Sequence, residues 1–154
     1  MGATVNIRPI TAADIPDMLP LVEQYWIFED IAGYDASRIG RELLRLCDDP
    51  RLGAGWLAEE EGRPVGYLLA VFVFSLEHLG LTTEIDEFFL LPSARGHGAG
   101  SALLAAVEAE SIRRECRNIS LQLGRGNETA RDFYRRQGYS ERSGFELHDK
   151  MLPQ

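Results

Sequence analysis

A short stretch with three glycines in five residues most constrains this chain, PSARGHGAGSALL from Pro92 to Leu104. It joins an apolar run that ends at Leu91 to a segment whose apolar residues recur with helical spacing. Glycine is needed where φ is positive or where a ligand approaches the backbone, and the amide groups that open a helix attract anions. The stretch therefore predicts a strand, a tight loop and a helix, with an anion site at the loop.

Two common phosphate motifs do not fit this loop. A P-loop needs a lysine after its last glycine, but Ser101 follows Gly100. A dinucleotide-binding fingerprint needs a third glycine in place of Ser101 and an acidic residue in place of Gly124. A tight turn without a ligand is the alternative, and Arg95 beside the glycines weighs against it.

The composition fits a single domain over residues 1–154, because 45% of the residues are hydrophobic and 26% are charged. The longest apolar run, from Val65 to Leu76, is too short for a membrane-spanning helix and is rich in β-branched and aromatic residues, so we expect a buried strand and no membrane partner. The first residues lack the pattern of a signal peptide, and Cys47 and Cys116 have no C-x-x-C spacing. These features predict a cytoplasmic protein with free thiols.

The charge is negative overall and unevenly divided. A formal net charge of −8 argues against a nucleic-acid partner. Residues 1–94 hold 6 Arg and 16 Asp and Glu, a balance of −10, whereas residues 95–154 hold 10 Lys and Arg and 8 Asp and Glu, a balance of +2. The glycine loop lies at the border between these two parts.

The order of the segments predicts a mixed sheet with helices on both faces. We expect helices over residues 11–25, 36–49, 100–116 and 128–137, the last capped by Asn127 and ended by Gly138. We expect strands at residues 4–10, 55–60, 65–75, 83–91, 118–124 and 145–152. The strand, helix and strand around the glycine loop imply a parallel crossover.

Two motifs occur in order along the chain. The pattern Arg95-x-x-Gly98-x-Gly100 follows a predicted strand, and NETARDFYRRQGY begins at Asn127, which opens a short predicted helix that carries a Tyr and ends in Gly-Tyr. Together they resemble the GNAT N-acetyltransferase superfamily: the first is similar to the family's pyrophosphate loop and the second to its other signature, an Asn that opens a short helix with a Tyr and a final Gly-Phe or Gly-Tyr. The resemblance implies the GNAT fold, an α/β domain with a central, mostly antiparallel mixed sheet of six to seven strands, whose fourth and fifth strands are splayed apart.

The resemblance also implies an N-acetyltransferase that moves an acetyl group from acetyl-CoA to a primary amine by direct transfer in a ternary complex, without a metal. The backbone amides of the loop would hold the CoA pyrophosphate beside Arg95, and the end of the preceding strand would offer main-chain groups to the pantetheine arm. The residues expected at the cofactor are Leu90, Leu91, Arg95, Gly96, His97, Gly98, Ala99, Gly100, Ser101, Asn127, Ala130 and Tyr134.

Four residues are the candidates for catalysis. Tyr134 matches the family's proton donor to the departing CoA thiolate, although it shares a helix face with Phe133 and could instead be a core aromatic. The amine must lose a proton, and a carboxylate, often through water, is the usual acceptor, although many members of the superfamily use other positions or none. We rank Glu84 and Asp86 together, followed by Glu87. Strand alternation puts Glu84 and Asp86 on one face and Glu87 on the other, and a bulge would exchange them.

The sequence leaves several alternatives open. The first alternative to an enzyme is a CoA-binding or protein-interaction module with the same fold but no activity. The second is a protein that binds the phosphate of a nucleotide. The acidic first part predicts a cationic acceptor, and a homodimer is left open. An aromatic group in the first half either lines an acceptor pocket or packs in the core: Tyr25, Trp26, Phe28 and Tyr34.

Overall fold

The computed structural model describes residues 4–154. Within it the chain divides into two compact units, the first ending at Gln122 and the second covering Leu123–Gln154, and each is described by itself. The expectation of one domain over residues 1–154 stays a prediction. None of the helices in the described part is long and apolar enough to cross a membrane.

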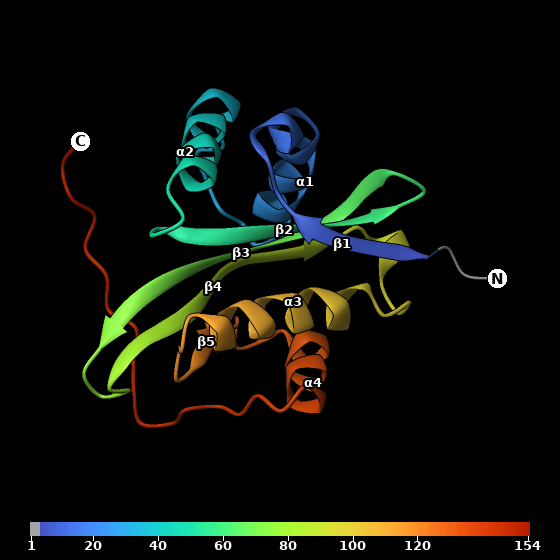
Figure 1. The fold of residues 1–154 in the computed structure, drawn as a ribbon. Helices are drawn as coiled ribbons and strands as arrows, with labels where there is room; N and C mark the ends of the chain where they lie inside the picture. The colour runs from blue at the N-terminus through green and yellow to red at the C-terminus, as the bar shows by residue number, and fades with distance from the viewer. Residues whose placement is uncertain (1–3) are drawn as a thin grey trace. The chain divides into compact units, whose positions relative to one another are not determined.

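The first unit is built on a five-stranded sheet whose strands lie in sequence order (Figure 1). The first four strands pair antiparallel with their neighbours, and β4 and β5 pair in parallel. The strands are β1 (Val5–Pro9), β2 (Gly53–Glu60), β3 (Arg63–Ser75), β4 (Gly80–Leu90) and β5 (Ile119–Leu121). The predicted parallel crossover from β4 to β5 is therefore confirmed.

Helices cover both faces of this sheet, as the sequence predicts (Figure 1). The short helix η1 (Ala12–Asp14) leads into α1 (Ile15–Phe28), and α1 lies with α2 (Ala36–Asp48) on one face. The other face carries α3 (Ala99–Arg113), which follows β4 and the one-turn helix η2 (Pro92–Ala94). The middle strand β3 is buried from Val65 to Ala70, because both of its faces are covered.

The core on the α1 and α2 face is a continuous apolar cluster. Its members come from both helices and from three strands, namely Met18, Leu21, Val22, Leu43, Leu57, Tyr67, Leu69 and Phe89. Met18, Leu57 and Tyr67 are completely buried. Burial of each large apolar side chain contributes about 1.5–3 kcal/mol, so this cluster holds α1 firmly against the sheet in which β4 carries the candidate carboxylates.

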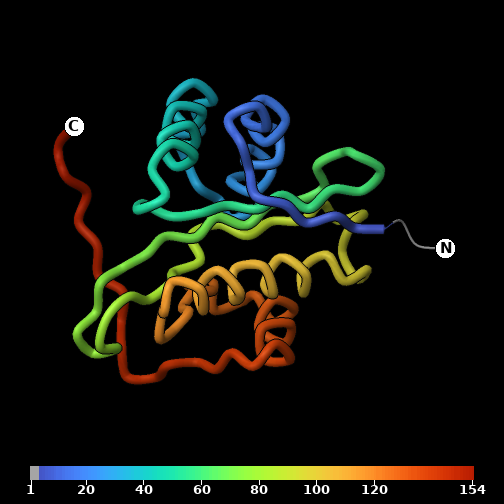
Figure 2. Tube along the Cα trace, in the orientation of Figure 1, coloured from blue at the N-terminus to red at the C-terminus, as the bar shows by residue number. Residues whose placement is uncertain are grey.

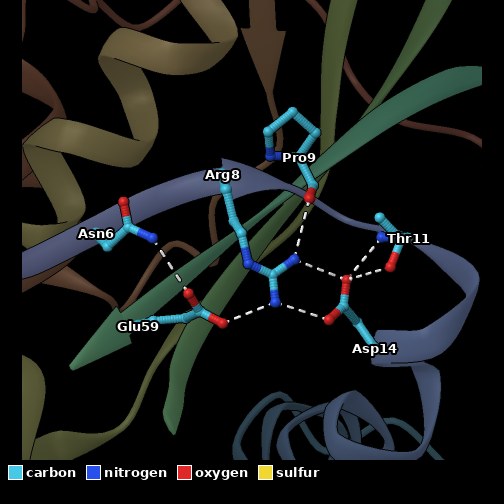
Figure 3. A network of polar contacts seen from close by, with 6 residues as sticks. All are labelled: Asn6, Arg8, Pro9, Thr11, Asp14 and Glu59. Atoms are coloured by element: carbon cyan, nitrogen blue, oxygen red, sulfur yellow. Dashed lines mark hydrogen bonds and ion pairs between the residues drawn. The ribbon is translucent and has the colours of Figure 1, made fainter. Parts of the chain in front are cut away.

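A charged network fixes the start of the chain against the sheet (Figure 3). The Arg8 guanidinium on β1 contacts both carboxylate oxygens of Asp14, at 2.9 and 2.7 Å, and Oε1 of Glu59 on β2, at 2.7 Å. Asp14 also accepts the backbone N–H of Thr11 at 2.7 Å, which closes the turn before α1. The network therefore joins β1, β2 and η1 by hydrogen bonds to ionised groups, which are stronger than neutral ones.

A buried pair of hydroxyls joins β4 to α3. Thr83 Oγ1 lies 2.7 Å from Ser111 Oγ, and both residues are buried. Because Ser111 donates its single hydroxyl hydrogen to the Val107 oxygen at 2.7 Å, Thr83 is the donor in the pair. This hydrogen bond fixes the side chain of Thr83, the residue before Glu84, on the face of the sheet that α3 covers.

The second unit contains α4 (Glu128–Arg136) and an irregular C-terminal segment. Figure 2 shows the chain continuing after α4 without a regular element to Gln154. The strand predicted at residues 145–152 is therefore wrong. Its apolar residues alternate, but Phe145 and Leu147 are 71% and 72% exposed, and a strand needs a partner on which to bury such side chains. The sheet accordingly has five strands instead of the six to seven expected.

Candidate active site

The glycine loop lies between η2 and α3. Gly96 and Gly98 have φ values of 80° and 90°, which side-chain-bearing residues adopt only with strain. A Cβ added at either position would meet nothing within 4 Å, so open space lies in front of this backbone. Buried Ala94 and Ala99 anchor the loop on its two sides. The backbone conformation and the free space both suit a ligand that lies against the loop.

The start of α3 has the electrostatic character of an anion site. Gly98 is the N-cap residue and offers no side-chain hydrogen bond to the helix, and the first turn contains no acidic residue. Gly100 is buried in the first turn, whereas His97 and Ser101 are exposed. The first amides of a helix lack partners within the helix and carry a partial positive charge. A phosphate group placed here would meet these amides without a competing carboxylate.

Arg95 already has partners in this structure. Its Nε donates to the main-chain oxygen of Leu90 at 3.0 Å. Its guanidinium carbon lies 5.7 Å from the ring centre of Phe28 and 5.8 Å from that of Phe89. These contacts hold the positive charge beside the end of β4, next to the loop.

The splayed edge predicted between the fourth and fifth strands is present. β5 pairs with β4 only at Thr83, Glu84 and Ile85, so among the described residues no strand pairs with that edge of β4 from Asp86 to Leu90. Leu90 turns its carbonyl toward Arg95. Leu91, however, donates its N–H to Val65 at 2.8 Å and accepts from Ala94 at 2.9 Å, so both of its main-chain groups have partners in the chain.

A β-bulge changes how the three candidate carboxylates lie. Leu69 of β3 pairs with Glu87 and Ala70 pairs with Ile85, which leaves Asp86 as the extra residue of β4. Because Leu69 belongs to the core on the α1 and α2 face, Glu87 points to that face. Glu84 pairs with Val71, two residues beyond Leu69, and so lies on the same face. The bulge thus places Glu84 and Glu87 on the same face, whereas strict alternation would have paired Glu84 with Asp86.

Glu87 is the most constrained of the three. Its Oε2 accepts from Nε1 of Trp26 on α1 and its Oε1 accepts from the hydroxyl of Tyr67 on β3, both at 2.9 Å. Burial raises the pKa of Glu87, and the two donors act in the opposite direction. Asp86 is accessible at the bulge, yet the protein atoms around it also raise its pKa.

Trp26 and Tyr67 were not singled out by the sequence as partners of a carboxylate. Tyr67 has the only hydroxyl in the apolar run from Val65 to Phe74, and a buried tyrosine hydroxyl needs a hydrogen-bond partner. That isolated hydroxyl was the one sequence feature that could have indicated a buried hydrogen bond from Tyr67. The identity of its acceptor depends on the register of β3 against β4, which the sequence alone did not define.

In the second unit, α4 carries the remaining candidates. Asn127 Oδ1 accepts the backbone N–H of Ala130 at 3.1 Å, which confirms the predicted helix cap. Tyr134 is half-buried, with ring centres of Phe133 and Tyr139 at 5.3 and 5.6 Å. Gly138 has a φ of 91°, as a residue that ends a helix often has. The cofactor roles of Asn127, Ala130 and Tyr134 stay predictions.

The described residues include no group of three or more His, Cys, Asp or Glu side chains arranged to hold a metal ion. The features found instead are a loop at a helix start that is suited to an anion, the open edge of β4 beside that loop, and a half-buried carboxylate, Glu87, on the same strand. These features suit a protein that binds a phosphate-bearing ligand along a strand with a carboxylate close by.

Comparisons with known proteins agree with this class. The model of the acetyltransferase (GNAT) family matches residues 17–139. An uncharacterized N-acetyltransferase of Bacillus subtilis, YhfO, is 28% identical over 145 residues, which cover 92% of this chain and 93% of that protein. The aminoalkylphosphonate N-acetyltransferase of Salmonella typhimurium is 34% identical over 136 residues, 88% of this chain and 85% of that protein.

Among solved structures, the aminoglycoside N-acetyltransferase AAC(6')-Iy in complex with CoA has the same fold, with a TM-score of 0.81, 20% identity and coverage of 99% of this chain and 98% of that one. The chain belongs to the GNAT acetyltransferase family. It is an N-acetyltransferase, and acetyl-CoA is the acetyl donor of this family, so these predictions are confirmed. The GNAT fold predicted from the two motifs is confirmed as well.

Proposed function

We propose that this protein transfers the acetyl group of acetyl-CoA directly to a primary amine, with both substrates bound at the same time. The observation that carries the proposal is the open glycine loop at the start of α3, next to the unpaired end of β4. Family membership favours an enzyme over a non-catalytic module of the same fold.

The proposed donor site uses the loop and the strand edge. Amides from Gly96 to Gly100 bind the pyrophosphate of acetyl-CoA, supported by the helix dipole and by the charge of Arg95. The pantetheine arm lies along the open edge of β4 and exchanges hydrogen bonds with its backbone. Leu90 is the residue suited to this contact, because its carbonyl faces the open edge of β4, where Arg95 also reaches it, whereas both main-chain groups of Leu91 are bonded within the chain.

The proposed reaction needs one base and one acid. A carboxylate of β4 takes a proton from the ammonium form of the acceptor, and the neutral amine nitrogen then attacks the thioester carbon. The new N–C bond forms, and the C–S bond breaks as the tetrahedral intermediate collapses. Tyr134, the proton donor that the family resemblance supplies, protonates the leaving CoA thiolate. The product amide returns its remaining extra proton to the Tyr134 phenolate through water, and the protonated carboxyl releases its proton to solvent.

Direct transfer is favoured over an acetyl-enzyme intermediate by the state of the cysteines. Cys47 lies on α2, and burial raises the pKa of its thiol, which lowers the fraction of reactive thiolate. Cys116 follows α3 and is half-buried. Both thiols are free, which suits the reducing cytoplasm in which we propose that the enzyme works.

Two acceptor classes compete. Glu84, Asp86 and Glu87 lie on β4, within the part of the sequence whose balance is −10, and a negative field concentrates cationic amines. The Salmonella relative is instead named for aminoalkylphosphonates, amines that also carry an anionic group. We propose the cationic amine as the acceptor, and the aminoalkylphosphonate is the second candidate.

Release of free CoA thiol from acetyl-CoA, measured with a panel of amines, tests the function. The panel contains polyamines, aminoglycosides, lysine derivatives and aminoalkylphosphonates. Initial rates at varied concentrations of both substrates should give intersecting double-reciprocal lines, whereas an acetyl-enzyme would give parallel lines. No thiol release above the rate without amine for any member, together with no effect of acetyl-CoA on the melting temperature, would refute the proposal.

A further inference from the structure

We propose that Glu87 is the general base of this enzyme and that Trp26 and Tyr67 are positioning residues that hold its carboxylate. This inference rests on the proposed acetyl transfer and identifies the base at that same site. It reverses the order suggested by the sequence, in which Glu84 and Asp86 came first.

The geometry around Glu87 fixes the plane of its carboxylate. Each oxygen accepts one hydrogen bond, and the two donors come from different elements, Trp26 from the last turn of α1 and Tyr67 from the centre of β3. An ionised carboxylate has about four acceptor positions, so two hydrogen bonds leave capacity for a proton. A carboxylate held in this way meets an acceptor amine in one orientation, which is the condition for efficient proton transfer.

Both donors are themselves held in place. The Trp26 ring packs edge-on against Tyr34, with centres 6.0 Å apart, and the Tyr34 hydroxyl donates to the Leu19 oxygen at 2.9 Å. Tyr67 is completely buried, and its ring centre lies 6.4 Å from that of Tyr25 and 6.5 Å from that of Phe89. Neither donor can turn away without disturbing the core. Support of this kind, one layer behind the reacting group, sets the precision of a site.

The other two carboxylates lack this support. Within residues 4–154, neither Glu84 nor Asp86 accepts a hydrogen bond from a protein side chain. Asp86 is exposed at the bulge, so no packed donor fixes the orientation of its carboxylate. Glu87 combines a fixed orientation with the partial burial that moves a carboxyl toward the pH range of a working base.

A purely structural tie between α1 and the sheet would use the same two hydrogen bonds, so a readout other than stability is needed. Trp26→Phe and Tyr67→Phe each remove one donor and keep an aromatic ring. Each hydrogen bond lowers the pKa of Glu87, so each variant should raise that pKa and move the rising limb of kcat/KM to higher pH, by about half a unit to one unit. Loss of orientation should also lower the plateau of kcat/KM by about tenfold per variant.

The same change can be measured without an acceptor. In protein labelled with ¹³C only at glutamate, the carboxyl signal of Glu87 is the one missing from Glu87→Gln, and its titration gives the pKa directly. Other ionisable groups near Glu87 are Glu84 and Asp86 on β4, Tyr25 and Glu29 at the end of α1, and Tyr67 itself. The label excludes Asp86, and the Gln variant separates Glu87 from Glu84 and Glu29.

Tyr25→Phe is the matched control. It removes a hydroxyl from the ring that packs against Tyr67, but this hydroxyl does not donate to Glu87, whose two oxygens are bonded to Trp26 and Tyr67. The Glu87 carboxyl of this variant should titrate as in wild type, because both hydrogen bonds to that carboxylate are kept.

Three results would overturn parts of the inference. An unchanged Glu87 titration in both donor variants rejects the positioning role. A Glu87→Gln enzyme that keeps the wild-type rate and rising limb rejects Glu87 as the base. A wild-type protein that releases no thiol with any amine and is not stabilised by acetyl-CoA refutes the proposed function itself, and with it the base, while the NMR titration still decides whether Trp26 and Tyr67 hold the carboxylate.

Discussion

Arg95 Nε donates to the main-chain oxygen of Leu90 at 3.0 Å, and this hydrogen bond places a positive charge at the point where β4 ends and the glycine loop begins. The contact uses a carbonyl at the open edge of β4, the edge along which we propose that pantetheine lies. Arg95 is therefore close to both groups of the cofactor that we expect to bind here, the pyrophosphate and the start of the pantetheine arm.

We predict that Arg95→Ala raises the KM for acetyl-CoA by about tenfold or more and changes kcat little, because a charge-assisted hydrogen bond contributes about 1.5–3 kcal/mol. Arg95→Lys keeps the positive charge but lacks the planar guanidinium, so its KM for acetyl-CoA should lie between those of wild type and Arg95→Ala. Steady-state kinetics at saturating amine measures both values. A KM for acetyl-CoA within twofold of wild type in Arg95→Ala would place the cofactor phosphates elsewhere.

Gly98→Trp should abolish acetyl-CoA binding and leave the protein folded. No atom lies within 4 Å of the added Cβ, so the side chain starts into open space and should occupy the region in front of the loop. The left-handed backbone at φ 90° adds a strain of about 1–2 kcal/mol. Gly62→Trp is the matched control, since Gly62 has a φ of 75° and equally open space in the turn between β2 and β3. Both variants should melt a few degrees lower, and only Gly62→Trp should be stabilised by acetyl-CoA.

Much of the fold could be predicted because the relevant signals are local. The apolar run after Val65 and the glycines after Arg95 determine a buried strand and a strand-to-helix turn through neighbouring residues alone. The segment from Phe145 shows the limit of this reasoning, since its alternation suits a strand but the structure pairs it with none. An alternating pattern shows that a segment could form a strand, but only the tertiary fold decides whether a neighbouring strand is available to pair with it.

The candidate site was predictable to a similar extent. The loop residues follow from a contiguous motif, but the face on which Glu87 lies depends on a single extra residue, Asp86, in the ladder between β3 and β4. A shift of one residue moves every following side chain to the opposite face. The partners of Glu87 come from positions 61 and 20 residues away, and no local pattern joins them.

The Arg8 network should make stability depend on pH in a defined direction. Hydrogen bonds from Arg8 lower the pKa values of Asp14 and Glu59, so their contribution is fully present above the carboxyl pKa of the unfolded chain, near 4, and is lost as the pH falls through the lower pKa of the folded state. Asp14→Asn should destabilise the protein by about 2 kcal/mol at pH 7.

Urea unfolding of wild type and Asp14→Asn at several pH values measures this effect. The difference in unfolding free energy should shrink steadily below pH 4, because protonation of Asp14 removes the same interaction that the variant lacks. Asp49→Asn is the control, since the Arg51 side chain in its ion pair is 89% exposed and the pair is screened by water, so little stability should be lost. A difference for Asp14→Asn that stays constant from pH 7 to pH 2 would contradict the assignment.

Tyr134→Phe should lower kcat by about 10²-fold while leaving the affinity for acetyl-CoA unchanged, because the phenol proton is required only as the thiolate forms. Tyr139→Phe is a matched control from the same unit, since its ring centre lies 5.6 Å from that of Tyr134. Comparison of kcat with the dissociation constant of acetyl-CoA distinguishes a proton donor from a residue that only packs in the core. An equal loss of stability and activity in both variants would return Tyr134 to a packing role.

The charge of the acceptor is the last property that can be tested on this chain. If the carboxylates of β4 attract a cationic amine, neutralising Glu84 alone should raise the KM for that amine several-fold and make kcat/KM less sensitive to salt, with kcat retained, because Glu84 shares the face of Glu87 but makes no hydrogen bond to it. Neutralising Glu87 should also reduce kcat, since the base is lost. If the acceptor is an aminoalkylphosphonate, Glu84→Gln should instead lower the KM for the acceptor, because a negative charge that repels its anionic group is removed. Measuring kcat/KM for a polyamine and an aminoalkylphosphonate at two salt concentrations, in wild type and in Glu84→Gln, therefore decides between the two classes of acceptor without altering the acetyl-CoA site.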